Sequence, residues 1–593
     1  MTKRMHKDII QGWQPYTDEE IERYTSKGFW QNLTVGDVLD RNAINIPDKM
    51  AIADDKVEIN WTELKQKADR IAIHLKKLGL ESGDFVILQT PNVIEFYYLL
   101  FGLARIGAIS VMCLPRHRKV EISHLVGLHQ AKAIIVPTDD RFDYVSMVEE
   151  LRQEHPYLKL LLSIGSRHNQ GWISIDELLE DNIEKDYAPD YLTQFKPDPN
   201  DLFIAQLSGG TTGVPKSIPK THNVTICQWD HGQRPYGLTD QSIYLTSAPL
   251  AHNLALSAIA GPMFYRGGIT IVTKSTKAED TFRLIEKYRV THMNLLPLLI
   301  IYLMESDEAR KKYDISSLKV IGAGGQKVKP ELVKWCVQEL GVSFSNTFGM
   351  TEGPTLSTRW DSPVEHHINT VGKPIIIDEC VETKLVNENN EEVKPGEIGE
   401  LVGRGLLTFK GYFKNPEENA KCFDKQGFFH TGDLFSIRED GSYIVEGRKK
   451  DMLIRGGENI YPEPVEGWLM KNPKILNAAV VGMADARLGE RLCAFVKLVE
   501  GENFDFEEMK QYLKEEGVAV FQWPERLEIV SGWPLTPMDK IDKRMLRAYI
   551  TTKQFQEKAI TKDLADEYLR TDKITVAEIL SGNIRINFTG TPS

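Results

Sequence analysis

Residues 202–216 read Leu-Phe-Ile-Ala-Gln-Leu-Ser-Gly-Gly-Thr-Thr-Gly-Val-Pro-Lys. The apolar run at 202–207 predicts a short strand, and the loop that follows carries three glycines, three hydroxyls and Lys216. Glycine lets the backbone adopt positive φ and approach a ligand closely, and successive N–H groups in such a turn form an anion-binding concavity. The loop is therefore predicted to hold phosphate groups at the carboxyl end of a strand, where α/β proteins bind ligands.

The spacing in this loop differs from that of a Walker loop, which has four residues between its glycines and then Gly-Lys-Ser/Thr. P-loop kinases and GTPases are therefore poor candidates. Taken alone, the run is also compatible with a glycine-rich surface turn, so other parts of the chain must decide between the two.

Composition sets broad limits on the function. The 593 residues are 41% apolar and 26% charged, as in a globular protein of several folding units. The net charge of −12 argues against bulk binding to nucleic acid or an anionic membrane. Residues 1–30 lack an apolar signal core, and the apolar stretches are too charged or too short to span a bilayer. The six cysteines show no C-x-x-C pair, which predicts reduced structural thiols in a cytoplasmic protein.

Hydrophobic periodicity predicts alternating helices and strands from about residue 61. Helical stripes span 64–78 and 92–105. Apolar runs typical of buried strands lie at 85–88, 108–113, 133–136, 160–164, 243–246, 269–272, 293–296 and 318–321. This alternation predicts parallel sheets with helices on both faces, an α/β fold.

The pattern changes after about residue 375. Short glycine-punctuated strands at 381–386, 399–403, 432–437 and 441–446 predict a small β-barrel or distorted sheet. A charged joint at 447–451 precedes an α+β unit with strands at 452–454, 478–481 and 492–498 and helices at 464–471 and 506–515. Residues 552–593 form a polar tail of unknown role, in which Thr575 and Glu578 predict a capping box.

Four further motifs carry groups that suit a nucleotide. Phe348 can stack on adenine, and Glu352 can hold Mg²⁺ on phosphate oxygens. Asp433, in a predicted tight turn at 430–434, and Arg448 can contact ribose or phosphate. Lys540 lies on a predicted loop. Each motif also has an ordinary alternative: a loop with one buried Phe, a common Gly-Asp turn, a solvated charge run and an exposed lysine.

The order of these motifs resembles the adenylate-forming superfamily over roughly residues 30–550. The resemblance is closest to stand-alone aryl-acid adenylating enzymes, namely 2,3-dihydroxybenzoate–AMP and salicylate–AMP ligases. It is carried by the motifs above and by residues 114–118, 218–222, 251–253, 445–451, 455–459 and 488–491.

The resemblance implies a domain plan. Residues 1–447 would form an N-terminal adenylation domain of two parallel α/β subdomains, up to about 375, and the β-barrel. Residues 448–451 would be a hinge with Lys450 as the hinge position, and 452–551 a mobile C-terminal lid.

It also implies roles for individual residues. Those for ATP are Ser208, Gly209, Gly210, Thr211, Thr212, Gly213, Lys216, Gly324, Thr347, Phe348, Gly349, Asp433 and Arg448. The catalytic residues would be Thr351, Glu352 and Lys540, with Glu352 as the Mg²⁺ ligand, and Gly456 and Gly457 would face the incoming thiol. The aryl acid would contact His252, Asn253, Ala258 and Gly324.

The aryl pocket departs from the dihydroxybenzoate pattern. Asn253 stands where amino-acid-activating relatives carry an aspartate, and a neutral amide can hydrogen-bond a carboxylate or an ortho-hydroxyl; His252-Asn253 is also compatible with a helix N-terminal cap. Ala258 replaces a serine and Leu254 a tyrosine, which predicts a more apolar pocket suited to salicylate, benzoate or another substituted benzoate. Asp539 stands where glycine is usual before the catalytic lysine.

The expected function is therefore a two-step ligase reaction. ATP and Mg²⁺ would activate an aryl acid to aryl-AMP, and a phosphopantetheine thiol of an aryl carrier protein would take the acyl group, in siderophore or related nonribosomal peptide biosynthesis. An aryl-CoA synthetase that uses coenzyme A is the alternative. A non-catalytic binding protein on the same fold is a third possibility, against which the five polar motif residues speak.

Overall fold

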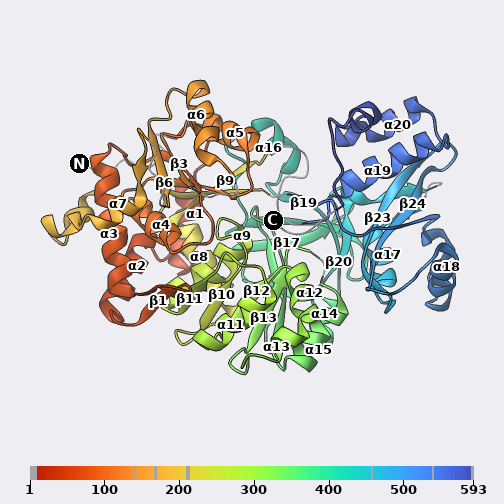
Figure 1. The fold of residues 1–593 in the computed structure, drawn as a ribbon, viewed down its shortest axis with the longest axis horizontal. Coiled ribbons are helices and arrows are strands. Elements are labelled where there is room, and N and C mark those ends of the chain that lie inside the picture. Colours follow the sequence, from red (N-terminus) through yellow and green to blue (C-terminus); the bar gives the residue numbers. More distant parts are fainter. Residues whose placement is uncertain are drawn as a thin grey trace. The chain divides into compact units, whose positions relative to one another are not determined.

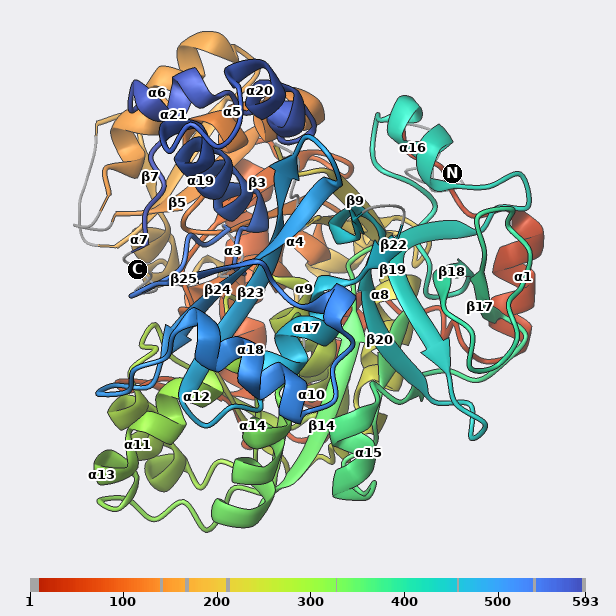
Figure 2. The same ribbon diagram turned by 90° about the vertical axis from the view of Figure 1, so that its right-hand side faces the viewer.

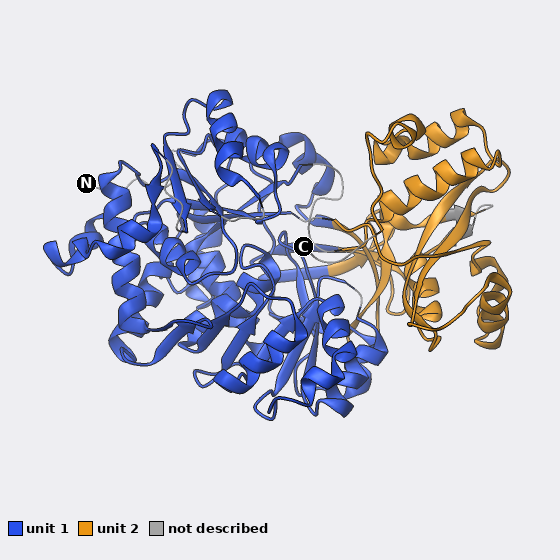
Figure 3. Cartoon of the chain, viewed as in Figure 1, with its two compact units in different colours: residues 1–210, 214–383, 402–430 blue, residues 211–213, 384–401, 431–593 orange. Residues whose placement is uncertain are grey.

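The computed structural model describes residues 10–138, 142–165, 170–208, 214–326, 328–455, 458–536 and 540–588. The chain divides into two compact units, coloured separately in Figure 3. Unit 1 comprises residues 1–210, 214–383 and 402–430. Unit 2 comprises residues 211–213, 384–401 and 431–593. The hinge predicted at 448–451 and the domain limits predicted at 1–447 and 452–551 stay predictions.

The first sheet of unit 1 has seven strands in the order β7-β6-β5-β3-β4-β8-β9. Their bounds are β3 Phe85–Gln89, β4 Ile109–Cys113, β5 Ala133–Pro137, β6 Leu160–Ile164, β7 Ile173–Ser174, β8 Leu202–Leu207 and β9 Ser217–Thr221. All neighbours pair in parallel except β8 and β9, which are antiparallel. Every residue of β3, β4 and β5 is buried, as expected for parallel strands covered on both faces.

The second sheet of unit 1 has nine strands in the order β16-β15-β14-β13-β12-β10-β11-β1-β2. Their bounds are β1 Met50–Ala53, β2 Glu58–Asn60, β10 Ile243–Thr246, β11 Ile269–Val272, β12 His292–Leu295, β13 Val320–Gly324, β14 Ser343–Gly349, β15 Thr355–Ser357 and β16 Lys373–Pro374. The strands from β1 to β14 along this order are parallel, and β2, β15 and β16 are antiparallel additions at the edges. The predicted α/β architecture is confirmed.

Helices lie around both sheets of unit 1 (Figure 1). The α-helices are α1 Asp18–Ser26, α2 Val35–Asn45, α3 Trp61–Lys77, α4 Glu95–Arg105, α5 Lys119–His129, α6 Tyr144–Glu154, α7 Ile175–Glu180, α8 His222–Gly232, α9 Asn253–Ala255, α10 Gly261–Arg266, α11 Ala278–Tyr288, α12 Pro297–Glu305, α13 Asp307–Arg310, α14 Pro330–Lys334, α15 Val364–Asn369 and α16 Pro416–Cys422. Short 3₁₀ or π segments are η2 Ile183–Asp186, η3 Tyr191–Phe195, η4 Arg234–Tyr236, η5 Leu256–Ala260 and η6 Trp335–Glu339.

The region predicted as a small barrel is a four-stranded sheet in the order β17-β18-β19-β20. Its strands are β17 Val381–Val386, β18 Gly399–Gly405, β19 Phe429–Ile437 and β20 Tyr443–Arg448. The tight turn predicted at 430–434 is wrong, because these residues lie within β19. Gly432, with φ 72°, lets the strand continue through a conformation that disfavours other residues.

Unit 2 contains a five-stranded sheet in the order β22-β21-β24-β23, with β25 paired to β24. The strands are β21 Leu453–Arg455, β22 Glu458–Ile460, β23 Ile475–Asp485, β24 Gly489–Leu498 and β25 Arg526–Ile529. The helices are η7 Lys449–Asp451, α17 Pro462–Leu469, α18 Phe506–Glu515, η8 Val520–Gln522 and α19 Lys543–Gln556. Figure 2 shows β23 and β24 as long neighbouring strands. Alternate β23 residues enter two cores, Val480 with α17 and α18, and Val481 with α19.

The C-terminal tail folds onto α19. It forms α20 Lys562–Leu569, η9 Arg570–Asp572 and α21 Val576–Leu580. The predicted capping box of Thr575 and Glu578 is confirmed at the start of α21. Ala548 of α19 joins a buried cluster with Leu569 and Val576, so the tail extends the core of unit 2.

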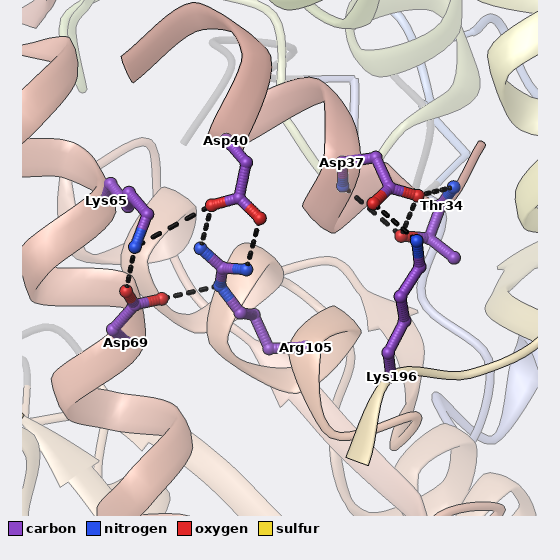
Figure 4. Close-up of polar contacts among 7 residues, drawn as sticks. All are labelled: Thr34, Asp37, Asp40, Lys65, Asp69, Arg105 and Lys196. Atoms are coloured by element: carbon purple, nitrogen blue, oxygen red, sulfur yellow. Dashed lines mark hydrogen bonds and ion pairs between the residues drawn. The ribbon is translucent and has the colours of Figure 1, made fainter. Parts of the chain in front are cut away.

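Four polar residues on three helices of unit 1 form the ion-pair group in Figure 4. Arg105 of α4 contacts Asp40 of α2 at 2.8 Å and Asp69 of α3 at 2.5 Å. Lys65 of α3 contacts the same two carboxylates, at 3.7 and 2.5 Å. Beside this group, Lys196 pairs with Asp37 at 2.6 Å, and Asp37 accepts the backbone N–H of Thr34, the N-cap residue of α2.

The described residues hold six free cysteines, five buried and Cys422 partly exposed. The prediction of reduced structural thiols agrees with this arrangement. Within the described ranges, no helix is long and apolar enough to cross a membrane.

Leu569→Ala should destabilise unit 2, because Leu569 is fully buried in the tail cluster. We expect a loss of about 2–4 kcal/mol, the usual cost of removing a buried leucine side chain. The measurement is the denaturant midpoint, followed by fluorescence and by proteolysis at sites in unit 2. Leu580→Ala is the matched control, because Leu580 lies 49% exposed in the same tail and should cost less than about 0.5 kcal/mol. Equal effects of the two changes would show that the tail core does not stabilise the unit.

Arg105→Ala should destabilise unit 1. It leaves Asp40 and Asp69 without their shared guanidinium, and the Arg105 side chain is only 11% exposed. We expect a loss of about 3 kcal/mol, as for a buried pair that loses one partner. Arg359→Ala is the control, since its pair with Asp361 is 63% and 43% exposed and should be worth about 0.5 kcal/mol. A midpoint shift no larger than that of the control would contradict the prediction.

Candidate functional site

The glycine-rich loop begins and ends on the antiparallel pair of β8 and β9. The N–H of Ser208 donates to the carbonyl of Lys216 at 2.9 Å. The N–H of Lys216 donates back to Oγ of Ser208 at 3.0 Å. The two ends of the predicted phosphate loop are therefore held together. Gly209, Gly210, Thr211, Thr212 and Gly213 lie outside the described residues.

Lys216 reaches a cluster of polar and aromatic groups in unit 1. Its ammonium pairs with Glu418 of α16 and lies 4.7 Å from the centre of the Tyr412 ring. The Tyr412 hydroxyl donates to Oε1 of Glu352 at 2.8 Å. Lys216 and Glu352 thus lie in one connected cluster.

Glu352 is a buried carboxylate, only 8% exposed. Burial raises its pKa, although the Tyr412 hydrogen bond and the charges of Lys216 and Lys220 oppose the rise. Among the described residues, no Lys or Arg lies within ion-pair distance of it. A desolvated oxygen donor with this unmet charge fits a hard divalent cation such as Mg²⁺.

The residues predicted around adenine lie on β13 and β14 and just beyond. A Cβ on Gly324 would lie 2.5 Å from the carbonyl oxygen of Thr347, so only glycine allows this approach of the two strands. The Thr347 hydroxyl bonds to the hydroxyls of Tyr236 and Ser357, at 3.0 and 2.8 Å. These bonds fix the Thr347 side chain between Tyr236 and Ser357.

Three other predicted site residues follow Thr347 along the chain, namely Phe348, Gly349 and Thr351. Phe348 is half-buried and Gly349 exposed. The hydroxyl of Thr351 lies 3.4 Å from the carbonyl oxygen of Leu207, the last residue of β8. This contact brings the end of β14 in one sheet to the end of β8 in the other.

The residues predicted to contact the aryl acid lie at the start of α9. Nδ1 of His252 accepts the N–H of Leu254 at 3.1 Å, so the helix-cap alternative for His252 is observed. Asn253 accepts a hydrogen bond from Lys220 at 3.2 Å. Ala258 lies half-buried in the π-helical segment η5.

In unit 2, Asp433 and Arg448 face each other across β19 and β20. Nε of Arg448 donates to Oδ1 of Asp433 at 3.0 Å. Burial raises the pKa of Asp433, while the charges of Arg448, Lys540 and Lys450 lower it. The backbone of Lys540 is fixed by two hydrogen bonds with Thr536. Three predicted residues, Asp433, Arg448 and Lys540, are thus electrostatically linked in unit 2.

Lys450 is an exposed residue of η7. Gly456, Gly457 and Asp539 lie outside the described residues. Sequence reasoning missed Tyr412, Glu418 and Lys220 as members of the site. Lys220 stands in the quoted 218–222 motif, but nothing in the local pattern shows that its strand points it at Asn253.

Comparison with known proteins identifies related enzymes. Residues 39–413 match the family model described as "AMP-binding enzyme", and residues 464–540 match "AMP-binding enzyme C-terminal domain". The chain is 35% identical over 548 residues to 2,3-dihydroxybenzoate-AMP ligase of Bacillus subtilis, covering 92% of this chain and 99% of that one.

Two further proteins are similar to this chain over most of its length. The salicyl-AMP ligase / salicyl-S-ArCP synthetase of Mycobacterium tuberculosis is 35% identical over 543 residues, covering 90% of this chain and 94% of that one. The solved apo structure of Mycobacterium smegmatis MbtA is 32% identical, with a TM-score of 0.68, covering 90% of this chain and 98% of that one.

Glu352→Gln should gain stability relative to wild type as the pH rises above the unfolded-state pKa of glutamate. The folded pKa of Glu352 is raised by burial, so the folded state binds the proton more tightly than the unfolded state. The stability of wild type therefore falls as pH rises from the unfolded pKa through the folded pKa, and glutamine removes this loss while it still accepts the Tyr412 hydrogen bond.

The measurement is the denaturant midpoint of both proteins between pH 4 and pH 9. Tyr412→Phe is the contrasting variant, since it leaves a buried carboxylate without its donor and should cost about 1–3 kcal/mol. A constant difference between wild type and Glu352→Gln across this pH range would contradict the assigned burial of the charge.

Proposed function

Because this chain belongs to the AMP-binding enzyme family, we propose that it is a ligase that activates an aryl carboxylic acid with ATP. An oxygen of the carboxylate attacks the α-phosphorus of ATP, the bond from that phosphorus to the pyrophosphate oxygen breaks, and aryl-AMP forms. The observation that carries the proposal is the joint placement of Lys216, Glu352 and the Lys220–Asn253 pair in unit 1. Groups suited to phosphate, a divalent cation and an aryl acid thus share one region.

The phosphate end of the site would be formed by the loop between β8 and β9. Ser208 and Lys216 hold the loop ends, and the Lys216 ammonium, beside Glu418 and the Tyr412 ring, would bind the departing β- and γ-phosphates. Glu352, with Thr351 beside it, would hold Mg²⁺, which neutralises phosphate charge when it is bound. Transfer at phosphorus depends mainly on such positioning and charge stabilisation.

The nucleoside would be bound by the residues predicted for adenine and for ribose. Phe348 would stack on adenine, and the backbone of β13 and β14 at Gly324, Thr347 and Gly349 would line its edge. Asp433, oriented by Arg448 at 3.0 Å, would accept hydrogen bonds from the ribose hydroxyls. Burial of this carboxylate supports the role, because a desolvated acceptor gains more from a ligand donor than an exposed one does.

Lys540 would bridge the aryl carboxylate and the α-phosphate. Its positive charge would offset the negative charge that gathers as the two anions approach. The charge of Lys540 acts on Asp433, which supports its placement near the ribose in unit 2.

The second step would transfer the acyl group to a thiol. We propose the phosphopantetheine thiol of an aryl carrier protein as acceptor, by analogy with the relative named salicyl-S-ArCP synthetase. The thiol would lose its proton to solvent, its sulfur would attack the acyl carbon, and the bond from that carbon to the phosphate oxygen would break, so that AMP leaves with the bonding electron pair. Unit 2 would rotate about Lys450 between the steps and bring Gly456 and Gly457 toward the thiol.

The substrate would be a benzoate-type acid, and siderophore or related nonribosomal peptide assembly would be the context. His252 and Asn253 would lie beside the acid, and Ala258 would line its ring. The partners would be the acid, ATP and the carrier protein, without nucleic acid or membrane. Six free thiols support the proposed cytoplasmic location.

Exchange of radiolabelled pyrophosphate into ATP, run with a panel of aryl acids, tests the function. We expect exchange with substituted benzoates and none with amino acids. Lys540→Ala should lower exchange by about 10²–10³-fold, because one charge stabiliser of the transition state is lost, yet spare thioester formation from supplied aryl-AMP. Lys514→Ala, an exposed lysine of α18, should match wild type in both assays.

Three outcomes would count against the proposal. Absence of exchange with every aryl acid would exclude the activity. Equal loss of both half-reactions in Lys540→Ala would remove Lys540 from the adenylation step. Faster acylation of coenzyme A than of an aryl carrier protein would replace the proposed acceptor with coenzyme A.

A further inference from the structure

Lys220 is a buried cation held by neutral groups. It lies on β9 and is only 7% exposed. Its ammonium donates to Oε1 of Gln228 at 3.1 Å and to Oδ1 of Asn253 at 3.2 Å. Within the described part of the chain, no carboxylate lies within ion-pair distance of this ammonium. Burial of a charge without a counter-ion is costly.

Two other buried cations in the described residues, Lys543 and Arg105, differ from Lys220 because they have carboxylate partners. Lys543 of α19 lies 2.7 Å from Glu466 and 3.7 Å from Glu463. Arg105 is paired with Asp40 and Asp69. In both cases a carboxylate offsets the buried charge, and Lys220 differs from these two residues in this respect. Lys220 has two of its three N–H groups on amide oxygens, and one remains for another acceptor.

The contact also fixes the direction of Asn253. A lysine ammonium has donors only, so the Asn253 amide must turn its oxygen toward Lys220 and its NH₂ away. Lys220 and Asn253 thus both offer donors to a ligand, and the Asn253 oxygen already accepts one hydrogen bond from Lys220. The pair favours a group that accepts hydrogen bonds over a group that only donates them.

We propose that Lys220 is a specificity-determining residue that, with Asn253, recognises an oxygen substituent ortho to the carboxylate of the aryl acid. The inference rests on the proposed function. An ortho-hydroxyl can donate its own proton to the adjacent carboxylate, which leaves its oxygen lone pairs facing the two protein donors. An ortho-amino group in the same place keeps a second N–H pointing at those donors, so it is rejected. An unsubstituted ring leaves the third N–H of the buried ammonium without an acceptor.

The test compares pyrophosphate exchange for 2-hydroxybenzoate, 2-aminobenzoate and benzoate in wild type and in Lys220→Met. We expect wild type to prefer 2-hydroxybenzoate. The variant should lose about 10- to 100-fold in kcat/KM for that acid, the range for a lost charge-assisted hydrogen bond. The ratio of its kcat/KM for 2-hydroxybenzoate to that for benzoate should fall relative to wild type, because benzoate offers no acceptor at that position.

Lys329→Met is the matched control. Lys329 is another buried lysine of unit 1, 8% exposed, whose pKa burial lowers to about 8. Its removal should leave the ratio of kcat/KM for 2-hydroxybenzoate to that for benzoate unchanged. An equal change of the ratio in both lysine variants would overturn the proposal.

A pH profile adds a readout that a merely structural role would not move. Burial lowers the pKa of Lys220 to about 7, and the charged group opposing this shift is Glu352. A lysine is charged below its pKa, so the wild-type preference for 2-hydroxybenzoate over benzoate should fall between pH 6 and pH 8.5. Lys220→Arg stays charged throughout this range, so its preference should be independent of pH. This comparison decides the matter if Lys220→Met does not fold.

The outcomes separate the inference from the function on which it rests. Exchange with aryl acids but an unchanged substrate ratio in Lys220→Met overturns the role of Lys220 and leaves the proposed function intact. An equal loss of kcat/KM for benzoate and for 2-hydroxybenzoate would mean that the Lys220 charge acts on the carboxylate or on folding. That result also overturns the proposed role of Lys220. Absence of exchange with every acid in wild type removes the proposed function and this inference together.

Discussion

The antiparallel pairing of β8 with β9 is the constraint on which the site depends. β8 continues the parallel sheet, and β9 returns beside it, so the intervening loop starts and ends at one place. The reciprocal bonds between Ser208 and Lys216 close it. Lys216 directly precedes β9, and Lys220 lies within it. Both charges act on Glu352.

This arrangement brings the two lysines near Glu352 without a direct ion pair between either lysine and that carboxylate. Glu352 bonds to Tyr412, Lys216 pairs with Glu418, and Lys220 bonds to two amides. Each of the three groups is thus held by side chains outside the trio. Holding Glu352 and Lys220 buried without a direct counter-ion costs stability. Under the proposed function, charged ligands would offset that cost.

Most of the fold could be predicted from the sequence, because buried parallel strands such as β3 and β5 are continuous apolar runs with few alternatives. The sequence-based prediction of secondary structure was wrong where a local turn signal competes with strand pairing. At 430–434, Gly-Asp is typical of a turn, yet pairing of Asp433 with Arg448 across β20 keeps the chain extended. The contact of Lys220 with Asn253 joins residues 33 positions apart, so no local spacing could reveal it.

The six cysteines have a chemical consequence for an enzyme that makes aryl-AMP. A mixed anhydride of this kind reacts with thiolates, and a protein that holds it is exposed to attack by its own sulfur. Burial raises the pKa of all six thiols, and even the partly exposed Cys422 has a pKa of about 11. Thiolate is therefore scarce within the chain. Acylation of the protein's own cysteines by an aryl-AMP product is therefore disfavoured.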